Sequence, residues 1–195
     1  MLRIQNRKIL FFLLPVIFIL ASCRPAPVPK PRAFFRIDLP EKEYRRFDEG
    51  YPYSFEYPVY AGISKVSTTM AEPWWINVDV PQFKASIHIS YKEIDNNLAA
   101  YLDDTHQLLS KHFTKAAGIR EDLIINEQEN IYGVIYHIRG PGVASASQFF
   151  VTDSLNHFLR GALYFNVIPN NDSLAPVIEF LKEDIQHLVE TLQWN

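Results

Sequence analysis

The sequence predicts a single α+β domain in which a mainly antiparallel β-sheet is packed by two long amphipathic helices. Two patterns support this fold class: short stretches that alternate apolar and polar residues, and two longer segments in which apolar residues recur every three or four positions. Their order along the chain is strands, helix, strands, helix, which is typical of α+β proteins. The 195 residues suffice for one core, and no internal repeat or second domain is visible.

Several stretches have the alternating pattern of β-strands. In residues 85–92, Ile87, Ile89 and Tyr91 point to one face of the sheet. In residues 51–58, prolines near both ends favour an edge strand. The charged run 41–46 before this stretch is expected to form a solvated turn or short helix. The predicted strands are residues 51–58, 75–80, 85–92, 123–126, 131–139, 147–152 and 157–168.

Two segments have the periodicity of amphipathic helices. The first spans residues 97–117, and Asp95 or Asn96 is expected to cap its start. Gly118 is expected to cap its end. The second helix spans residues 173–192. Both apolar faces are expected to pack against the sheet.

The first residues of the chain have the features of an export signal. Arg3, Arg7 and Lys8 precede an apolar run over residues 9–21. At ~1.5 Å per residue in a helix, this run covers about 20 Å, whereas the hydrocarbon layer of a membrane is ~30 Å thick. The run therefore predicts the short apolar core of a signal peptide. The alternative is a signal anchor that is followed by a cysteine by chance.

The apolar run ends in Leu-Ala-Ser-Cys, which resembles the bacterial lipobox, and Cys23 is the only cysteine of the chain. The resemblance implies that Cys23 is a lipid anchor that carries a diacylglyceryl group and a further acyl chain such as palmitate, with cleavage just before it. Two or more acyl chains hold a protein on a membrane almost permanently. A single cysteine also excludes an internal disulfide bond and a multi-cysteine metal site.

These features divide the chain into a signal peptide (residues 1–22), the lipidated cysteine with a proline-rich tether (23–33) and the α+β domain (34–195). Alternate prolines favour polyproline II at ~3.1 Å per residue, so the tether extends about 30 Å. A leader without a spacing role is the alternative.

The residues after the cysteine bear on localisation. Arg24 follows it, and no run of acidic residues of the kind that directs lipoproteins to the cell surface lies next to it. We therefore expect a periplasm-facing domain in the cell envelope, on either the inner or the outer membrane.

Composition and spacing argue against several functions. A net charge of −3 argues against a dedicated nucleic-acid binder. Asp153, Ser154 and His157 are residue types found in hydrolases, but they lie within one expected turn, which rarely orients a base against its nucleophile. His88 and His137 are expected on a half-solvated sheet face rather than in a metal site. We therefore expect no enzyme, no cofactor and no metal.

Candidate residues for an interaction surface include one of two adjacent tryptophans. On a strand, Trp74 and Trp75 point to opposite faces. One of them is therefore either covered by residues 34–60 or exposed to a partner, since exposed tryptophan is enriched at interfaces. A basic spot on the otherwise acidic domain is expected from Arg139, His157 and Arg160.

Several further motifs are specific enough to compare with known families. They are residues 35–40 (FRIDLP), 53–58 (YSFEYP), 87–92 (IHISYK), 152–154 (TDS) and 157–165 (HFLRGALYF). Together they resemble the gliding-motility lipoprotein GldD family of Bacteroidetes, over roughly residues 20–195. The chain departs from that family at Trp74, where a small residue or a cysteine is expected.

The resemblance implies a membrane-anchored envelope lipoprotein that supports gliding motility and the type IX secretion machinery. We expect a non-enzymatic assembly or stabilising subunit, held to the membrane through Cys23 and docked to other gliding or secretion envelope proteins. The order of elements is also similar to the Mog1/PsbP-like sandwich, which is a likeness of fold alone. The alternative is a periplasmic lipoprotein that binds a small ligand or a glycan, which a deep aromatic pocket would favour.

The tripeptide Asp-Ser-Leu occurs twice, around Ser154 and Ser173. It resembles the sites that are O-glycosylated in Bacteroidetes envelope proteins, so both serines are candidates for this modification. The alternative is structural, because Asp and Ser also favour turns and helix N-caps.

Overall fold

The computed structural model describes residues 37–69, 71–167 and 170–195. Within this part of the chain, the predicted α+β class and its two helices are confirmed. The signal peptide, the tether and Cys23 lie outside the described residues. The elements are β1 (Tyr44–Phe47), β2 (Tyr53–Pro58), β3 (Gly62–Lys65), β4 (Ile76–Val80), the short 3-10 helix η1 (Pro81–Phe83), β5 (Ala85–Glu93), α2 (Leu98–Ser110), β6 (Gly118–Asn126), β7 (Ile131–Arg139), β8 (Ser147–Thr152), β9 (His157–Phe165), α3 (Asn171–Glu190) and β10 (Gln193–Trp194).

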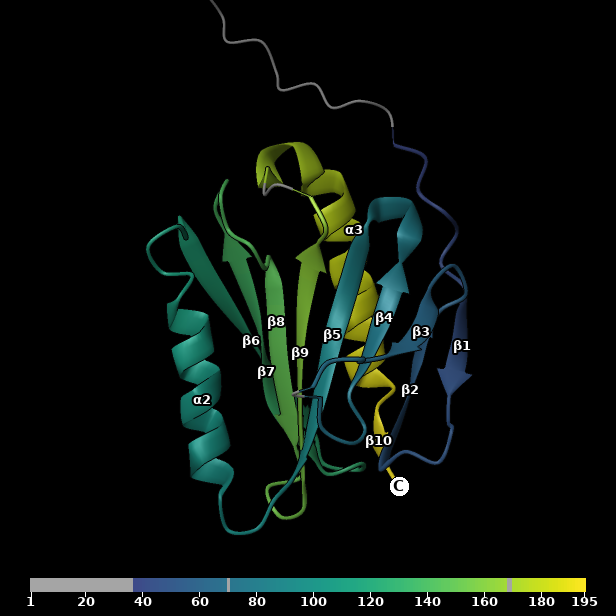
Figure 1. Cartoon of the computed structure of the whole chain (residues 1–195), viewed down its shortest axis with the longest axis vertical. Helices are drawn as coiled ribbons and strands as arrows, with labels where there is room; N and C mark the ends of the chain where they lie inside the picture. The colour runs from purple at the N-terminus through teal and green to yellow at the C-terminus, as the bar shows by residue number, and fades with distance from the viewer. Residues whose placement is uncertain (1–36, 70, 168–169) are drawn as a thin grey trace, which may run out of the picture. The chain divides into compact units, whose positions relative to one another are not determined.

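Two antiparallel sheets form the domain. The larger has seven strands in the order β3-β4-β5-β9-β8-β7-β6, and the smaller has the order β1-β2-β10. The two helices lie on opposite sides of the larger sheet (Figure 1). The main core lies between this sheet, the smaller sheet and α3, whereas a smaller core packs α2 onto β7, β8 and β9. No helix stands in front of β3, β4 and β5 (Figure 1).

A buried carboxylate joins the N-terminal strands to α3. Asp184 is 1% exposed and accepts a hydrogen bond from Lys42 Nζ at 2.6 Å. It also accepts hydrogen bonds from the hydroxyls of Tyr44, at 3.0 Å, and of Tyr60. Burial, together with the nearby Asp184, raises the pKa of both tyrosines, so both remain neutral donors. Three protein donors thus compensate the burial of the Asp184 carboxylate.

The first helix is shorter than the sequence predicts. It ends at Ser110, and Gly118 begins β6 instead of capping the helix. The reason is competition with the sheet, because the Ala117 amide donates to the Arg139 carbonyl and so starts the β6–β7 ladder. The predicted caps are also wrong: Asn97 occupies the N-cap position.

Strand pairing changes the expected roles of the N-terminal segment. Part of the charged run 41–46 forms β1, because its backbone pairs with β2. In this pairing Tyr44 lies opposite Pro58, and Phe47 lies opposite Phe55. The expected edge strand, β2, lies between β1 and β10. The short strands β3 and β10 have no counterpart in the sequence-based prediction, because four and two residues are too few to show a period.

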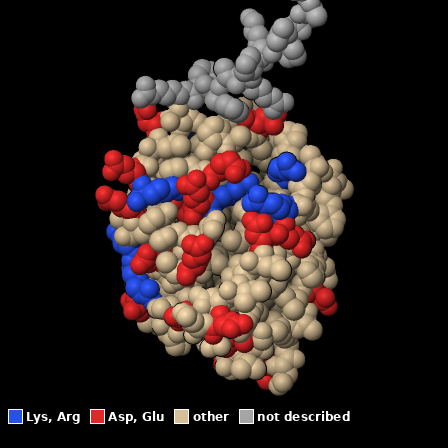
Figure 2. Space-filling view, turned by 180° about the vertical axis from the view of Figure 1, so that it is seen from behind, with Lys and Arg blue, Asp and Glu red and all other residues tan. Residues whose placement is uncertain are grey.

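Charges on the α3 side of the domain are mixed in sign. Figure 2 shows positive and negative side chains next to one another across the upper half of this face. The pairs Lys182–Glu179 and Lys42–Asp184 belong to this side. Among the described residues, no helix is both long and apolar enough to cross a membrane.

Candidate functional site

Two of the predicted interaction residues, Trp74 and His157, meet at one end of the larger sheet. They line an open hollow of about 620 Å³, together with Tyr51, Tyr91 and Asn195. The hollow lies where β9 begins and β5 ends, since His157 pairs with Glu93. The aromatic side chains that line the hollow therefore come from both sides of the junction between the smaller and the larger sheet.

Trp74 precedes the strand instead of lying on it. Its φ of 70° is left-handed, and its carbonyl accepts a hydrogen bond of 2.6 Å from the Tyr53 hydroxyl. The indole packs edge-on against Tyr51 at 5.2 Å and remains 45% exposed. The neighbouring Trp75 points elsewhere and donates its indole N–H to the Tyr91 carbonyl at 3.0 Å. Of the two tryptophans, Trp74 is thus the exposed one, and its role in partner binding stays a prediction.

His157 is held between two aromatic residues. Its Nδ1 lies 2.8 Å from the Tyr91 hydroxyl, and its ring stacks on Trp194 at 5.0 Å. Burial and nearby carboxylates raise the pKa of Tyr91 to about 12, so this hydroxyl stays protonated. The contacts fix the ring of His157 as part of the joint between the sheets.

Asp153 organises the β8–β9 turn. Its Oδ1 accepts backbone N–H groups of Leu155, Asn156 and His157 at 3.0, 2.8 and 2.8 Å. Burial would raise the pKa of Asp153, but these donors and the His157 ring outweigh it and lower that pKa below its usual value. The carboxylate is therefore engaged in the turn, as the turn interpretation of Asp153, Ser154 and His157 predicts.

The two arginines do not join His157 in one basic spot. Arg139 is exposed at the end of β7 and pairs with Gly118, at the opposite end of the sheet from His157. Arg160 is half-buried on the side of the sheet that faces α2, where its guanidinium donates to Gln148 Oε1 at 2.8 Å. The structure thus separates the residues from which a basic spot was expected.

Both candidate glycosylation serines are exposed. Ser154 lies in the β8–β9 turn with a φ of 69°, and Ser173 lies in the first turn of α3. The helix begins at Asn171, with Asn170 at the N-cap, so Ser173 is not the cap that the structural alternative required. Glycosylation at either serine stays a prediction.

The two histidines considered for a metal site lie on opposite faces of the sheet. His137 faces α3 and contacts Asp122, whereas His88 faces the other side and contacts Tyr164 edge-on at 5.3 Å. Across the part of the chain that the structure describes, no group of three metal-binding side chains comes together.

The outermost strand of the larger sheet exposes an apolar strip that sequence analysis missed. β6 pairs with β7 on one side, and no described strand lies on its other side. Leu123 is 75% exposed and Ile125 is 68% exposed, next to Tyr132 of β7. The alternating apolar residues of β6 were visible in the sequence, but the position of the strand at a sheet edge was not.

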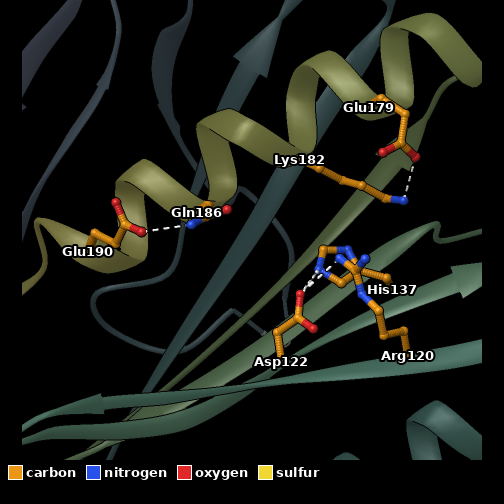
Figure 3. A network of polar contacts seen from close by, with 7 residues as sticks. All are labelled: Arg120, Asp122, His137, Glu179, Lys182, Gln186 and Glu190. Carbon is orange, nitrogen blue, oxygen red and sulfur yellow. Dashed lines mark hydrogen bonds and ion pairs between the residues drawn. The ribbon is translucent and has the colours of Figure 1, made fainter.

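A polar groove of about 590 Å³ borders this edge on the α3 side. Figure 3 shows side chains of β6 and β7 opposite those of α3. His137 Nε2 lies 2.9 Å from Asp122 Oδ2, which also accepts Arg120 Nη2 at 2.9 Å. Burial, followed by Lys182 and Arg120, lowers the pKa of His137, so its contact with Asp122 is a hydrogen bond of the neutral ring. The lining of the groove thus combines the carboxylates of Asp122, Glu127 and Glu190 with a neutral histidine.

Comparison with known proteins found one matching family and a solved structure with weak similarity. The sequence matches the family described as "Gliding motility lipoprotein GldD" over residues 24–194. None of the curated proteins matches the chain. The solution structure of cyanobacterial PsbP (CyanoP) from Synechocystis sp. PCC 6803 is similar, with a TM-score of 0.43 and 11% identity over 80% of this chain and 95% of that chain.

Proposed function

Because this chain belongs to the gliding motility lipoprotein GldD family, we propose that it is a periplasm-facing envelope subunit that stabilises the gliding and type IX secretion machinery without catalysing a reaction. Cys23 is the lipid anchor in this proposal, and residues 24–33 are the spacer. Anchoring confines the domain to the membrane surface and raises its effective concentration toward membrane-bound partners. The domain then acts through a docking surface.

The exposed edge of β6 is the observation that carries this proposal. Natural sheets usually protect an edge strand with charged side chains, because its free backbone groups can pair with another chain. Here Leu123 and Ile125 stand out at 75% and 68% exposure. A partner segment in extended form gains backbone hydrogen bonds and apolar contacts at such an edge.

The charges around the edge indicate the chemistry of that segment. Glu121, Glu127 and Glu129 are all exposed and surround the apolar strip. Opposite charges on the partner steer the encounter and fix its register. The occupant we infer is therefore an extended apolar segment of an envelope protein, flanked by lysine or arginine.

The docking edge is tested with the double substitution Leu123→Lys/Ile125→Lys. Both side chains are exposed, so the stability of the domain should change by less than about 0.5 kcal/mol. Cells that carry the variant should lose gliding movement, and crosslinking should no longer join the protein to its envelope partners. Leu155→Lys is the matched control, since Leu155 is 74% exposed in the β8–β9 turn. Normal gliding and unchanged crosslinking in the double variant would contradict the docking edge.

The anchor is tested separately with Cys23→Ser. Loss of the thiol prevents acylation, so the protein should leave the membrane fraction and appear in the soluble fraction after centrifugation. A variant that sediments with membranes as firmly as the unchanged protein would show that another feature holds the chain there.

A further inference from the structure

The side of the larger sheet that faces α2 is only half covered. The helix packs over β7, β8 and β9, and the strands beside it carry polar side chains outwards, including Ser64, Asn77 and His88. Figure 1 shows this front of β3, β4 and β5 without a helix. A cavity of about 300 Å³ lies where the uncovered half meets α2.

Aromatic side chains form part of the wall of this cavity. Trp75, Tyr101 and Phe158 line it, and Leu108 of α2 closes one side. The Tyr101 and Phe158 rings lie 5.4 Å apart. Pockets of about 300 Å³ are at the small end of those that bind organic ligands, and such pockets combine apolar walls with a few polar groups.

Arg160 of β9 is one of several polar side chains that line the cavity, and the Tyr164 hydroxyl lies beside its guanidinium. Its Nη2 donates to Gln148 Oε1 at 2.8 Å, but its buried Nε has no hydrogen-bond partner. Gln148 is 2% exposed, and its Nε2 also has no partner. Both N–H donors are therefore left without an acceptor, which costs free energy, and Arg160, which lines the cavity, is the one that a ligand there can satisfy.

No neighbouring carboxylate compensates the positive charge of Arg160 among the described residues. Within the described ranges, no carboxylate lies at ion-pair distance from Arg160, whereas Lys92 is paired with Glu72. Asp104 lies on the exposed rim formed by α2. Burial lowers the pKa of Arg160, which is the direction expected for a cation withdrawn from water. A bound oxyanion would compensate this charge through short, charge-assisted hydrogen bonds.

We propose that this cavity binds a small organic anion, with a phosphate or carboxylate group on Arg160 and an apolar or aromatic body between Trp75, Tyr101 and Phe158. The site lies on a different surface from the exposed edge of β6. An experiment can therefore disprove ligand binding in the cavity without disproving docking at the β6 edge, and the reverse.

Titration calorimetry on the purified full chain in a non-ionic detergent tests the site with phenyl phosphate as the probe. Saturable binding is expected, with a dissociation constant of about a millimolar or tighter for a ligand of this size. Inorganic phosphate lacks the aromatic body and phenol lacks the charge, so both should bind at least about 10-fold more weakly. No saturation by phenyl phosphate, or equal binding of either fragment, would overturn the proposal.

Three substitutions locate the binding. Arg160→Met should weaken phenyl phosphate binding at least about 10-fold, since it removes the charged donor. Leu108→Trp fills the cavity from the exposed side of α2 and should also block binding, so the test does not depend on the fold of one variant. Arg139→Met is the matched control and should bind normally. Normal binding by both Arg160→Met and Leu108→Trp would overturn the proposal.

The phosphate could also belong to a lipid headgroup, and a second titration distinguishes the two sources. Vesicles that contain phosphatidylglycerol are expected to leave phenyl phosphate binding unchanged when they are added first. Binding to these vesicles that depends on Arg160, without any response to phenyl phosphate, would overturn the proposal of a free ligand.

Discussion

Two buried polar clusters, one on each side of the larger sheet, differ in how completely they are hydrogen-bonded. On the α3 side, the carboxylate of Asp184 receives hydrogen bonds from Lys42, Tyr44 and Tyr60. On the α2 side, Arg160 Nε and Gln148 Nε2 are buried without a partner. A satisfied network stabilises a fold, whereas unsatisfied groups reduce stability and are retained where they serve another purpose. The comparison thus sets the hydrogen-bonded cluster around Asp184, which stabilises the fold, against the cluster around Arg160, where we propose that a ligand binds.

The largest effect is expected from Asp184→Ala. Removing this carboxylate breaks the buried ion pair with Lys42 and leaves two tyrosine hydroxyls without their acceptor, which should lower the free energy of unfolding by about 3–5 kcal/mol. Urea unfolding of the purified protein measures the change. Arg160→Met on the other side is the matched variant and should lower stability by only about 1–2 kcal/mol, because it removes an unsatisfied donor together with one hydrogen bond to the buried Gln148. Equal losses in the two variants would break the comparison.

A smaller loss is expected from Gly161→Ala in β9. A Cβ atom at this position would lie 2.2 Å from ring atoms of Phe149, a buried side chain of the main core. The ring must move, which should lower the free energy of unfolding by about 1–3 kcal/mol in thermal or urea unfolding. Gly62→Ala serves as the control, because nothing lies within 4 Å of its Cβ position. A stable Gly161→Ala variant would mean that the core on the α3 side repacks easily.

The smallest effect concerns pH. The pKa of His137 is lowered in the folded protein, mainly by burial, from an ordinary value of 6.5. Below pH ~6.5 the unfolded chain therefore binds a proton that the folded protein does not, and stability falls as the pH decreases, by at most about 1.4 kcal/mol per pH unit for one group. Unfolding measured between pH 7 and pH 5 should show a shallower decline in His137→Gln. An identical decline would place the lost stability at other groups.

Most long periodic elements could be predicted from the sequence, whereas the short strands and the first half of β6 could not, since only residues 123–126 of β6 were predicted. Strands β7 and β8 have the bounds that alternation predicts, and α3 begins and ends two residues before its predicted limits. In contrast, β1 contains Arg45 and Arg46, and it becomes a strand because its backbone pairs with β2. The end of α2 likewise depends on the β6–β7 ladder. Such pairing is invisible to a local pattern.

The candidate sites show the same limit. Trp74 and His157 were singled out separately, and the structure brings them to one hollow. The sequence predicts Arg160 in a basic spot at the surface, but its hydrogen bond to Gln148 and its position beside α2 make it part of a cavity. Burial of a polar residue depends on neighbours that are distant in sequence, so its chemistry cannot be read from its own motif.

The contacts of Asp184 also set the order in which the chain can fold. Its partners Lys42, Tyr44 and Tyr60 precede it by 142, 140 and 124 residues. A polypeptide that emerges from its amino end can pair β1 with β2 early, but this pair cannot pack against α3 until nearly the whole chain has appeared. Contacts of such long range slow folding, and the aromatic segment around Phe55 is open to self-association or to a chaperone during that interval.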